Sequence, residues 1–203
     1  MARTRLSPGN RRAQLVDLGL EVLSTRPLDR VSVDEIAAAA GISRGLLFHY
    51  FDSKRDYLVA VVRAAADQLL ELTTPDPSLP PVEQLRDGLE RYVAFVDEHR
   101  EIYVGLLRGG GGDADLQAIF DETRAVIAHR VLAGVGAADD PSPVVQLVAR
   151  GWVGFVEEAA IEWLGSDRSL SKGELVTLLE QSLVQLLLVA AQGAANFGSL
   201  STL

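Results

Sequence analysis

Apolar residues recur at helical spacing along almost the whole chain, and no segment alternates apolar and polar residues as a strand would. Near the start, for example, Val16, Leu20 and Leu23 fall on one face of a helix. Proline- and glycine-rich stretches separate the periodic segments, most clearly residues 73–81, which contain four prolines. The pattern predicts an all-helical chain. We expect a first helix closed by Pro27, followed by helices at 33–40, 43–50, 53–72, 81–98, 100–108, 113–135, 143–165 and 171–194, with frayed residues from Asn196.

Local signals mark where these helices start and stop. Capping boxes begin at Ser32, Ser53 and Ser171, each with an acidic residue three positions later. Ser142 before Pro143 is another favourable start, because serine caps and proline fits the first turn. Gly41 follows the second predicted helix and can end it in the left-handed conformation.

Composition places the chain among globular proteins and excludes several kinds of chemistry. It has 203 residues, of which 48% are hydrophobic and 23% charged, enough for one large domain or two small ones. There are no cysteines, which excludes disulfide frameworks, thiolate metal sites and thiol catalysis. The basic start lacks the apolar run of a secretion signal, and the most apolar stretch, 183–195, is interrupted by glutamines and too short to span a bilayer. We therefore expect a soluble cytoplasmic protein with no membrane partner.

The net charge of −9 is unevenly distributed. Residues 1–63 contain ten basic and seven acidic residues, a net charge of +3, and the other 140 residues carry −12. Attraction to phosphates depends on the local surface, so the acidic total does not exclude DNA binding. A basic end joined to an acidic body favours two functions in one chain.

Residues 33–50 form the strongest motif. Two short predicted helices meet at Gly41, with the small Ala37 before it and the apolar Leu47 after it. A helix-turn-helix needs this arrangement: a small residue for close crossing, a turn residue with positive φ, and an apolar anchor under the reading helix. An ordinary helical corner is the alternative, since glycine-capped helix pairs are common.

The stretch VSVDEIAAAAGISRGLLFHYFDSKRDYLVAVV resembles the DNA-binding domain of the tetracycline-repressor (TetR) family of transcriptional regulators. The upstream helix with Ala13, Val16, Gly19 and Leu23 fits as well, so the resemblance covers about the first 65 residues, and the remainder is similar in length and helical layout. It implies an all-α fold with an N-terminal three-helix helix-turn-helix domain at 1–52 and a helical effector-binding and dimerisation domain at 53–203. It also implies a homodimer that binds a palindromic double-stranded DNA operator.

The residues that we predict to contact DNA lie in or beside the motif. They are Ser32, Ser43, Arg44, Gly45, Leu46, Phe48, His49, Tyr50 and Lys54. Arg44 can pair with guanine or phosphate, whereas Leu46 can make only apolar contacts such as one with a thymine methyl. Lys54, at a helix start, can combine its charge with free backbone amides against a phosphate. The family usually has tyrosine in place of Phe48, which here lacks a hydroxyl group for a phosphate. Arg3 and Arg5 can form a minor-groove arm or simply a solubilising tail.

The resemblance assigns effector binding and dimerisation to the body. The predicted helices at 143–165 and 171–194 are apolar over more than one stripe, which favours burial of two faces, although a plain core is the alternative. The predicted interface residues are Val156, Ala159, Trp163, Leu179, Leu183 and Leu186. An apolar pocket would suit a small hydrophobic or amphipathic effector, and each of its candidate residues can instead be simple core. The pocket candidates are Tyr92, Phe95, Tyr103, Leu107, Phe120, Ile127, Trp152 and Phe155.

No catalytic or metal-binding constellation is recognisable, so we expect no enzyme activity and no cofactor. The three histidines are far apart in sequence, no Glu-x-x-His pair occurs, and the glycines at 109–112 are not followed by the Lys-Ser/Thr of a phosphate loop. Ser169 and Lys172 fit a Ser-x-x-Lys pattern whose companion elements are absent. The sequence thus predicts a ligand-responsive DNA-binding regulator, most simply a repressor. The alternatives are a DNA-binding dimer without an effector and a helical protein–protein adaptor.

Overall fold

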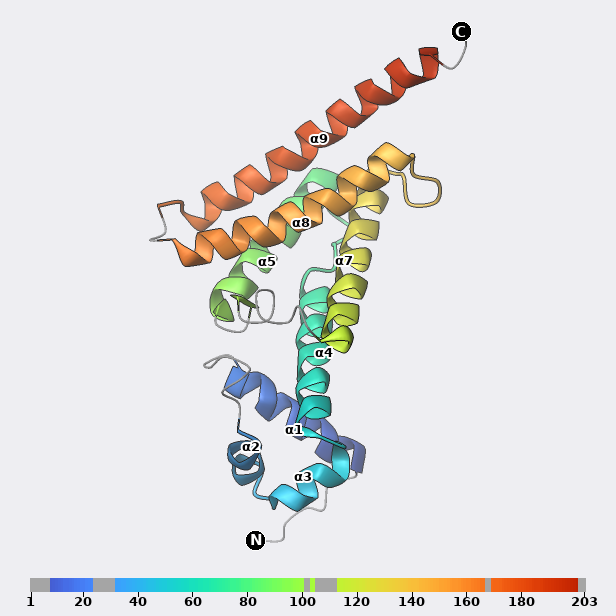
Figure 1. Ribbon diagram of the computed structural model, residues 1–203. Coiled ribbons are helices and arrows are strands. Elements are labelled where there is room, and N and C mark those ends of the chain that lie inside the picture. The colour runs from blue at the N-terminus through green and yellow to red at the C-terminus, as the bar shows by residue number, and fades with distance from the viewer. Residues whose placement is uncertain (1–7, 24–31, 101–102, 105–112, 167–168, 201–203) are drawn as a thin grey trace. The chain divides into compact units, whose positions relative to one another are not determined.

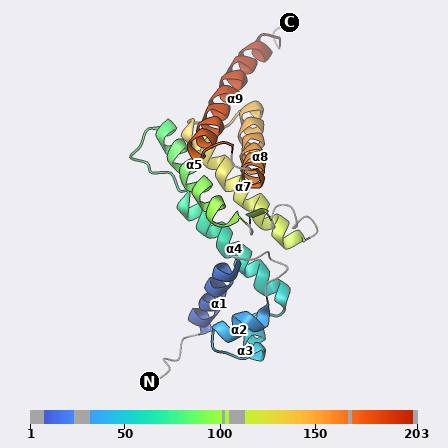
Figure 2. The same cartoon turned by 90° about the vertical axis from the view of Figure 1, so that its left-hand side faces the viewer.

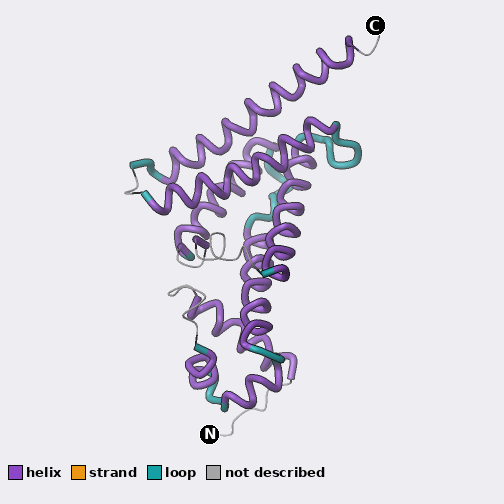
Figure 3. Tube along the Cα trace, in the orientation of Figure 1, coloured by secondary structure: helices purple, strands orange, loops and turns teal. Residues whose placement is uncertain are grey.

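The computed structural model describes residues 8–23, 32–100, 103–104, 113–166 and 169–200, and the regular elements within these ranges are helices, without a strand (Figure 3). The helices are α1 (Pro8–Leu23), α2 (Val33–Ala39), α3 (Arg44–Tyr50), α4 (Lys54–Leu72), α5 (Pro81–Glu98), α7 (Ala114–Gly134), α8 (Pro143–Gly165) and α9 (Lys172–Leu200). The all-helical prediction is confirmed. Most of the predicted helix 100–108 lies outside the described residues, although 103–104 are helical.

Contacts divide the chain into two compact units, whose helices can be followed in Figures 1 and 2. The first unit contains Met1–Gln68 and Glu98–Ile119, and the second contains Leu69–Asp97 and Phe120–Leu203. Both α4 and α7 therefore contribute residues to both units. The expected division of function between residues 52 and 53 stays a prediction, because backbone contacts do not tell which residues meet DNA or an effector.

The first unit is built around the packing of α1 on α2, of α2 on α3, and of α1 on the first half of α4. Leu15, Ile36, Leu47 and Tyr57 are fully buried there. The Tyr57 hydroxyl donates a hydrogen bond of 2.8 Å to the backbone carbonyl of Leu15. Burial raises the pKa of Tyr57 above its ordinary value, so its hydroxyl keeps the proton for this bond even in alkaline solution that would ionise an exposed tyrosine.

Gly19 is what allows α1 to approach α4 so closely. A methyl group built at Gly19 would lie 2.5 Å from the Tyr57 hydroxyl oxygen and 2.5 Å from Cγ2 of Val61. A side chain larger than hydrogen fits only if the Tyr57 and Val61 side chains, or the helix that carries them, shift. The glycine thus has a packing role in the unit that carries α2 and α3.

The second unit contains the long helices α8 and α9, which run antiparallel and pack side by side (Figure 1). The indole Nε1 of buried Trp152 donates to the Leu179 carbonyl and to Ser182 Oγ, each at 3.0 Å. Trp163 Nε1 donates to the carbonyl of Leu170, in the connection between the two helices, at 2.8 Å. Both tryptophans therefore satisfy their only polar atom within the chain.

Ion pairs join α5 and α7 to this helix pair. Arg86 and Glu180 connect α5 with α9 at 2.7 Å, and Lys172 pairs with Asp97 at the same distance. Arg124 on α7 contacts Glu157 on α8 at 2.8 Å. Partial burial raises the pKa of Glu157, and the hydrogen bond from Arg124 opposes that change.

Helix α9 differs from the sequence prediction in two respects. It continues to Leu200 instead of ending near residue 194, since the weak helix formers Gly193, Asn196 and Gly198 do not interrupt it. Its residues Lys172–Gln192 are also long and apolar enough, by length and composition, to cross a membrane. Residues 183–195, which the sequence analysis considered alone, belong to this longer apolar helix. A single such helix is weak evidence for a membrane, since core helices of soluble proteins pass the same test.

Candidate nucleic-acid interface

The turn between α2 and α3 has the geometry that the motif requires. Gly41 has φ of 64°, in the left-handed region that favours glycine, as the sequence predicts. The backbone amides of Gly41 and Ile42 donate to the carbonyls of Ala38 and Ala37, at 3.0 and 2.9 Å, which closes the end of α2. The chain can then reverse sharply into α3.

Serine caps fix the starts of both helices. Ser43 Oγ accepts a hydrogen bond of 3.2 Å from the Leu46 amide at the start of α3, and Ser32 Oγ accepts one of 3.5 Å from the Glu35 amide at the start of α2. Both predicted DNA-contacting serines therefore act first as caps. The hydroxyl hydrogen of the exposed Ser43 can still be donated to an acceptor outside the chain.

Helix α3 separates one anchoring side chain from an exposed face. Leu47 is completely buried against the unit, and Phe48 and Tyr50 are half-buried. Ser43, Arg44, Gly45, Leu46 and His49 are exposed, with Leu46 at 41%. The exposed face thus contains the hydrogen-bond donors and the small and apolar groups that major-groove reading uses.

Arg44 is held at the start of α3 by two neighbours. Its Nη1 donates a hydrogen bond of 2.8 Å to Asp34 Oδ2 on α2. Its guanidinium carbon lies 5.4 Å from the centroid of the Phe48 ring, one turn further along α3. The guanidinium group is therefore oriented while remaining largely in solvent.

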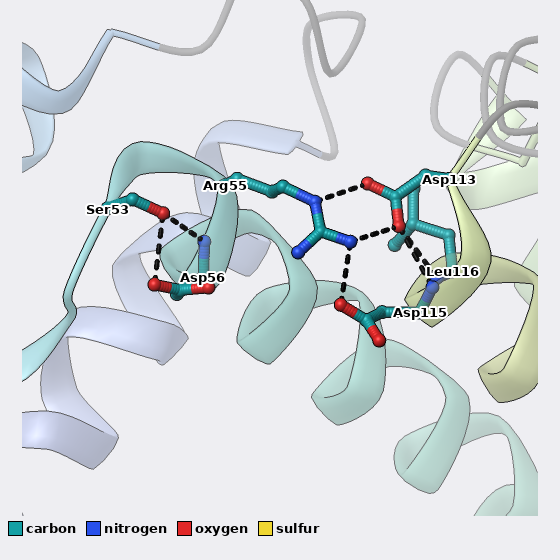
Figure 4. Close-up of polar contacts among 6 residues, drawn as sticks. All are labelled: Ser53, Arg55, Asp56, Asp113, Asp115 and Leu116. Atoms are coloured by element: carbon teal, nitrogen blue, oxygen red, sulfur yellow. Dashed lines mark hydrogen bonds and ion pairs between the residues drawn. The ribbon is translucent and has the colours of Figure 1, made fainter.

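The residues that follow α3 place further groups beside it. His49 and Tyr50 meet edge to face at 5.4 Å. The predicted capping box at Ser53 is confirmed: Ser53 Oγ accepts from the Asp56 amide at 3.1 Å and donates to the Asp56 carboxylate at 3.0 Å (Figure 4). Lys54 is exposed in the first turn of α4, where its cationic side chain and the free backbone amides of the helix start can together bind an anion.

Arg55, beside Lys54, belongs to a cluster that the sequence did not predict. Its Nε and Nη2 donate to the two oxygens of Asp113 at 2.8 and 2.7 Å, and Nη2 also pairs with Asp115 at 2.6 Å (Figure 4). Asp113 in turn accepts the backbone amides of Asp115 and Leu116 at the start of α7. These hydrogen bonds, above all those from Arg55, hold the pKa of Asp113 below its usual range. We call Arg55, Asp113 and Asp115 the α4–α7 clasp.

The predicted pocket residues fall at dissimilar places. Tyr92, Phe95 and Trp152 are buried, Phe120, Ile127 and Tyr103 are half-buried, and Phe155 is 42% exposed on α8. Leu107 lies outside the described residues. Tyr103 belongs to the first unit, whereas the other described candidates belong to the second. In the described ranges no group of three or more histidine, aspartate or glutamate side chains gathers as a metal site would require.

The predicted interface residues are mostly internal to the single chain. Val156, Trp163, Leu179 and Leu183 are buried, Ala159 is half-buried, and Leu186 is 40% exposed. Other apolar side chains on α8 and α9 face solvent instead. They are Val144, Leu147, Phe155, Leu178, Val184, Leu188 and Val189, in addition to Leu186.

Two short helices, α2 and α3, are joined by a tight turn at a glycine, and the second of them exposes a face that can read DNA. This arrangement defines a helix-turn-helix DNA-binding protein. Two family descriptions match the chain and agree with this class. Residues 15–61 match "Bacterial regulatory proteins, tetR family", and residues 81–186 match "Tetracyclin repressor-like, C-terminal domain". The chain therefore belongs to the TetR family and is a DNA-binding transcriptional regulator.

Individual relatives lead to the same conclusion. A solved tetR-family transcriptional regulator from Streptomyces coelicolor is 34% identical, with 96% of this chain and 88% of that one covered and a TM-score of 0.86. A TetR-like regulator from Rhodococcus sp. RHA1 is 28% identical over 90% of this chain and 98% of that one, with a TM-score of 0.67. The transcriptional activator FasR of Mycolicibacterium smegmatis is 25% identical over 194 residues, which cover 85% of this chain and 80% of FasR. Both family matches and these relatives are regulators of transcription and indicate no enzymatic family.

Proposed function

We propose that the chain is a ligand-responsive repressor that binds a palindromic operator as a homodimer and releases it when a small hydrophobic or amphipathic effector binds. The observation that carries the proposal is the division of α3 into the buried anchor Leu47 and the exposed face of Arg44, Gly45, Leu46 and His49. Arg44 can pair with guanine, and Leu46 can contact a thymine methyl. Lys54 and the half-buried Tyr50 can contact flanking phosphates.

Two copies would read two half-sites on one face of the duplex. The symmetry of a homodimer predicts a palindrome, and reading successive major grooves on one face of the duplex puts the half-site centres about 34 Å apart, one turn of B-DNA. In this proposal residues 1–52 contact the operator, and residues 53–203 bind the effector and dimerise. The protein would act in the cytoplasm, where its DNA target lies, without a cofactor and without enzymatic activity of its own.

Dimerisation is best supported by the exposed apolar residues of α8 and α9. Leu147 is 72% exposed, Phe155 42% and Leu178 48% in the single chain, an unfavourable state unless another apolar surface covers them. We place the interface on these residues and on Leu186, with Ala159 at its edge. Val156, Trp163, Leu179 and Leu183 would support it from beneath, since they are buried already. The same contact would cover the apolar surface of α9 without a membrane.

The effector is proposed to contact the aromatic residues of the second unit. Tyr92 and Phe95 on α5 and Trp152 on α8 are buried apolar groups, and Phe120 and Ile127 on α7 are partly accessible. The Trp152 indole already has two acceptors, so a ligand would meet its apolar ring rather than its N–H group. These surfaces suit a ligand that is mostly apolar with few polar groups.

The α4–α7 clasp offers a route from effector to operator. Three residues separate the end of α3 from the start of α4, and Arg55 in the first turn of α4 is bound to Asp113 and Asp115 at the start of α7. A shift of α7 on effector binding would pull on α4 and change where α3 is presented. A change of a few ångströms suffices, because the spacing of the major grooves is fixed, and a coupling of about 1–3 kcal/mol is ordinary for such systems.

Selection of bound duplexes from a random pool tests DNA binding and symmetry together. We expect a palindrome with half-site centres one helical turn apart. Arg44→Ala should then weaken binding to that palindrome by about 1–3 kcal/mol. Arg150→Ala, which removes an exposed arginine from α8, is the control and should bind normally. Selection of no sequence, or of a site without symmetry, contradicts the proposal.

Two further measurements address the effector and the direction of regulation. Thermal-shift screening with apolar and amphipathic compounds should identify a ligand that raises the melting temperature and lowers operator affinity. If no compound does so, a DNA-binding dimer without an effector replaces the ligand-responsive regulator. Because the relative FasR is named an activator, a reporter under the selected palindrome is needed: its expression should fall when the protein is produced and recover with the ligand.

A further inference from the structure

Among the described residues, Asp34 on α2 is the acidic residue that pairs with Arg44. Its Oδ2 accepts a hydrogen bond of 2.8 Å from Arg44 Nη1, ten positions further along the chain. Both side chains are highly exposed, Arg44 at 60% and Asp34 at 62%, so the pair lies at the surface and not in the core. Exposed pairs of this kind contribute little to stability, so their value lies in orienting a side chain.

The geometry around Arg44 leaves one edge of its guanidinium group open. Asp34 occupies Nη1, and the Phe48 ring lies 5.4 Å from the guanidinium carbon. Within the described part of the chain no hydrogen bond engages Nε or Nη2 of Arg44. A guanine presents the acceptors O6 and N7 side by side in the major groove, and two parallel N–H donors of one arginine match them.

We propose that Asp34 is a specificity-determining residue that positions Arg44 for bidentate pairing with a guanine. This inference rests on the proposed operator binding by α3 and adds a residue from α2 that does not itself read a base. Because Asp34 holds one nitrogen of the guanidinium group and the Phe48 ring lies beside it, Arg44 loses fewer conformations when it binds a base. Without the carboxylate, the same side chain is free to turn toward the nearest phosphate, which carries no sequence information.

A carboxylate near DNA also repels phosphates, and the two effects of Asp34 have opposite consequences for binding. Removing its charge should strengthen binding to any duplex, because one repulsive charge is lost. Removing its orienting contact should weaken the preference for guanine at one position of each half-site. Affinity alone therefore cannot identify a positioning role, whereas base preference can.

The test compares base preference for four full-length proteins by selection from a random duplex pool, followed by competition with duplexes altered at each position. They are the wild type, Asp34→Ala, which removes both the charge and the acceptor for Arg44, Arg44→Ala and the double variant. Glu35→Ala is the matched control, since it removes the same charge from the same first turn of α2. A thermal melt of each variant checks that α2 still folds, because both acids lie where the helix dipole favours them.

We expect Arg44→Ala to remove the preference at one base pair per half-site, and Asp34→Ala to reduce the preference at that same base pair about tenfold. Glu35→Ala should keep it, and Asp34→Ala should change nothing further once Arg44 is absent. If Asp34→Ala and Glu35→Ala instead raise affinity for all duplexes equally and keep the preference, Asp34 is only a negative charge and the inference is wrong. If Arg44→Ala leaves every preference intact, Arg44 reads no base and the inference fails while operator binding stands. A wild type that selects no sequence would overturn the proposed function, and this inference with it.

Discussion

The exposed surface of α3 and that of the α8–α9 pair differ in the side chains that they leave in solvent. On α3 the single deeply buried residue is Leu47, and the exposed face carries Arg44 and His49 beside one apolar group, Leu46. On α8 and α9 an apolar core is already complete, yet further apolar residues remain exposed. The first surface suits a polar, anionic partner, and the second suits another apolar surface.

This difference teaches that hydrophobic periodicity and exposure answer separate questions. Periodicity indicates how many sides of a helix can be buried, and the folded chain shows which sides are still open. For α3 both give the same answer, because one apolar stripe meets one core. For α9 periodicity and exposure give different answers, because the helix has several apolar stripes and only one of them is buried within the chain.

The largest expected effect separates the covered and uncovered sides of α9 at two consecutive leucines. Leu179 is fully buried, so Leu179→Ala should lower the free energy of unfolding by about 2–5 kcal/mol through lost burial and a cavity. Leu178 is 48% exposed, so Leu178→Ala should change monomer stability far less and should weaken dimerisation instead. Chemical denaturation and sedimentation equilibrium measure the two quantities. Equal losses of monomer stability would mean that the two sides are not distinct.

In the first unit the corresponding test is overpacking at Gly19. Gly19→Ala should destabilise the protein by about 2–4 kcal/mol, because the new methyl group collides with Val61 and with the Tyr57 hydroxyl and threatens its hydrogen bond to Leu15. Gly9→Ala, also in α1, meets nothing within 4 Å and serves as the control that leaves stability unchanged or slightly higher. Thermal melts of both variants measure the difference in stability. An unchanged melting temperature for Gly19→Ala would show that α1 and α4 are not in close contact.

Local features of the fold were predictable from the sequence, and contacts between distant residues were not. The cap at Ser43, the positive φ at Gly41 and the start of α8 at Pro143 each depend on a few neighbouring residues. The resemblance also indicated which helix carries the candidate DNA-contacting face. The α4–α7 clasp joins residues 58 positions apart, and the contact of Asp34 with Arg44 spans a turn. Neither follows from periodicity, because a charged residue on a solvated face has many possible partners.

The predicted interface shows a different limit of sequence reasoning. Trp163 and Leu183 are apolar residues on helices with several apolar stripes, and sequence alone offers no means of choosing which stripe meets the chain's own core. The structure buries both residues within the single chain and exposes Phe155, which the sequence had suggested for the pocket. The choice depends on the angle at which α8 and α9 cross their neighbours, which is a property of the assembled unit.

A smaller effect concerns the cap of the reading helix. Ser43→Ala should cost about 1 kcal/mol of stability, because the Leu46 amide loses its acceptor at the exposed start of α3. Ser43→Gly should cost only a few tenths, since glycine tolerates the cap conformation. Denaturation curves of the two variants give the difference. If both variants weaken operator binding equally while differing in stability, the hydroxyl contacts DNA in addition to capping, which sharpens the assignment of this surface to a polar partner.

Breaking the α4–α7 clasp should cause the smallest change in stability. We expect this change to be visible in how the melting temperature depends on salt concentration. The folded pKa of Asp113 is depressed, so its contribution is present above the unfolded value near ~4 and is lost only as pH falls through the lower folded value. Between pH 5 and 8 the clasp should therefore not respond to pH, whereas added salt screens it. The melting temperature of Arg55→Gln should accordingly fall less between low and high salt than that of the wild type, and Arg150→Gln should behave as the wild type. Identical salt dependence in all three proteins would mean that the clasp contributes nothing in solution, and the proposed route from α7 to α3 would lose its physical link.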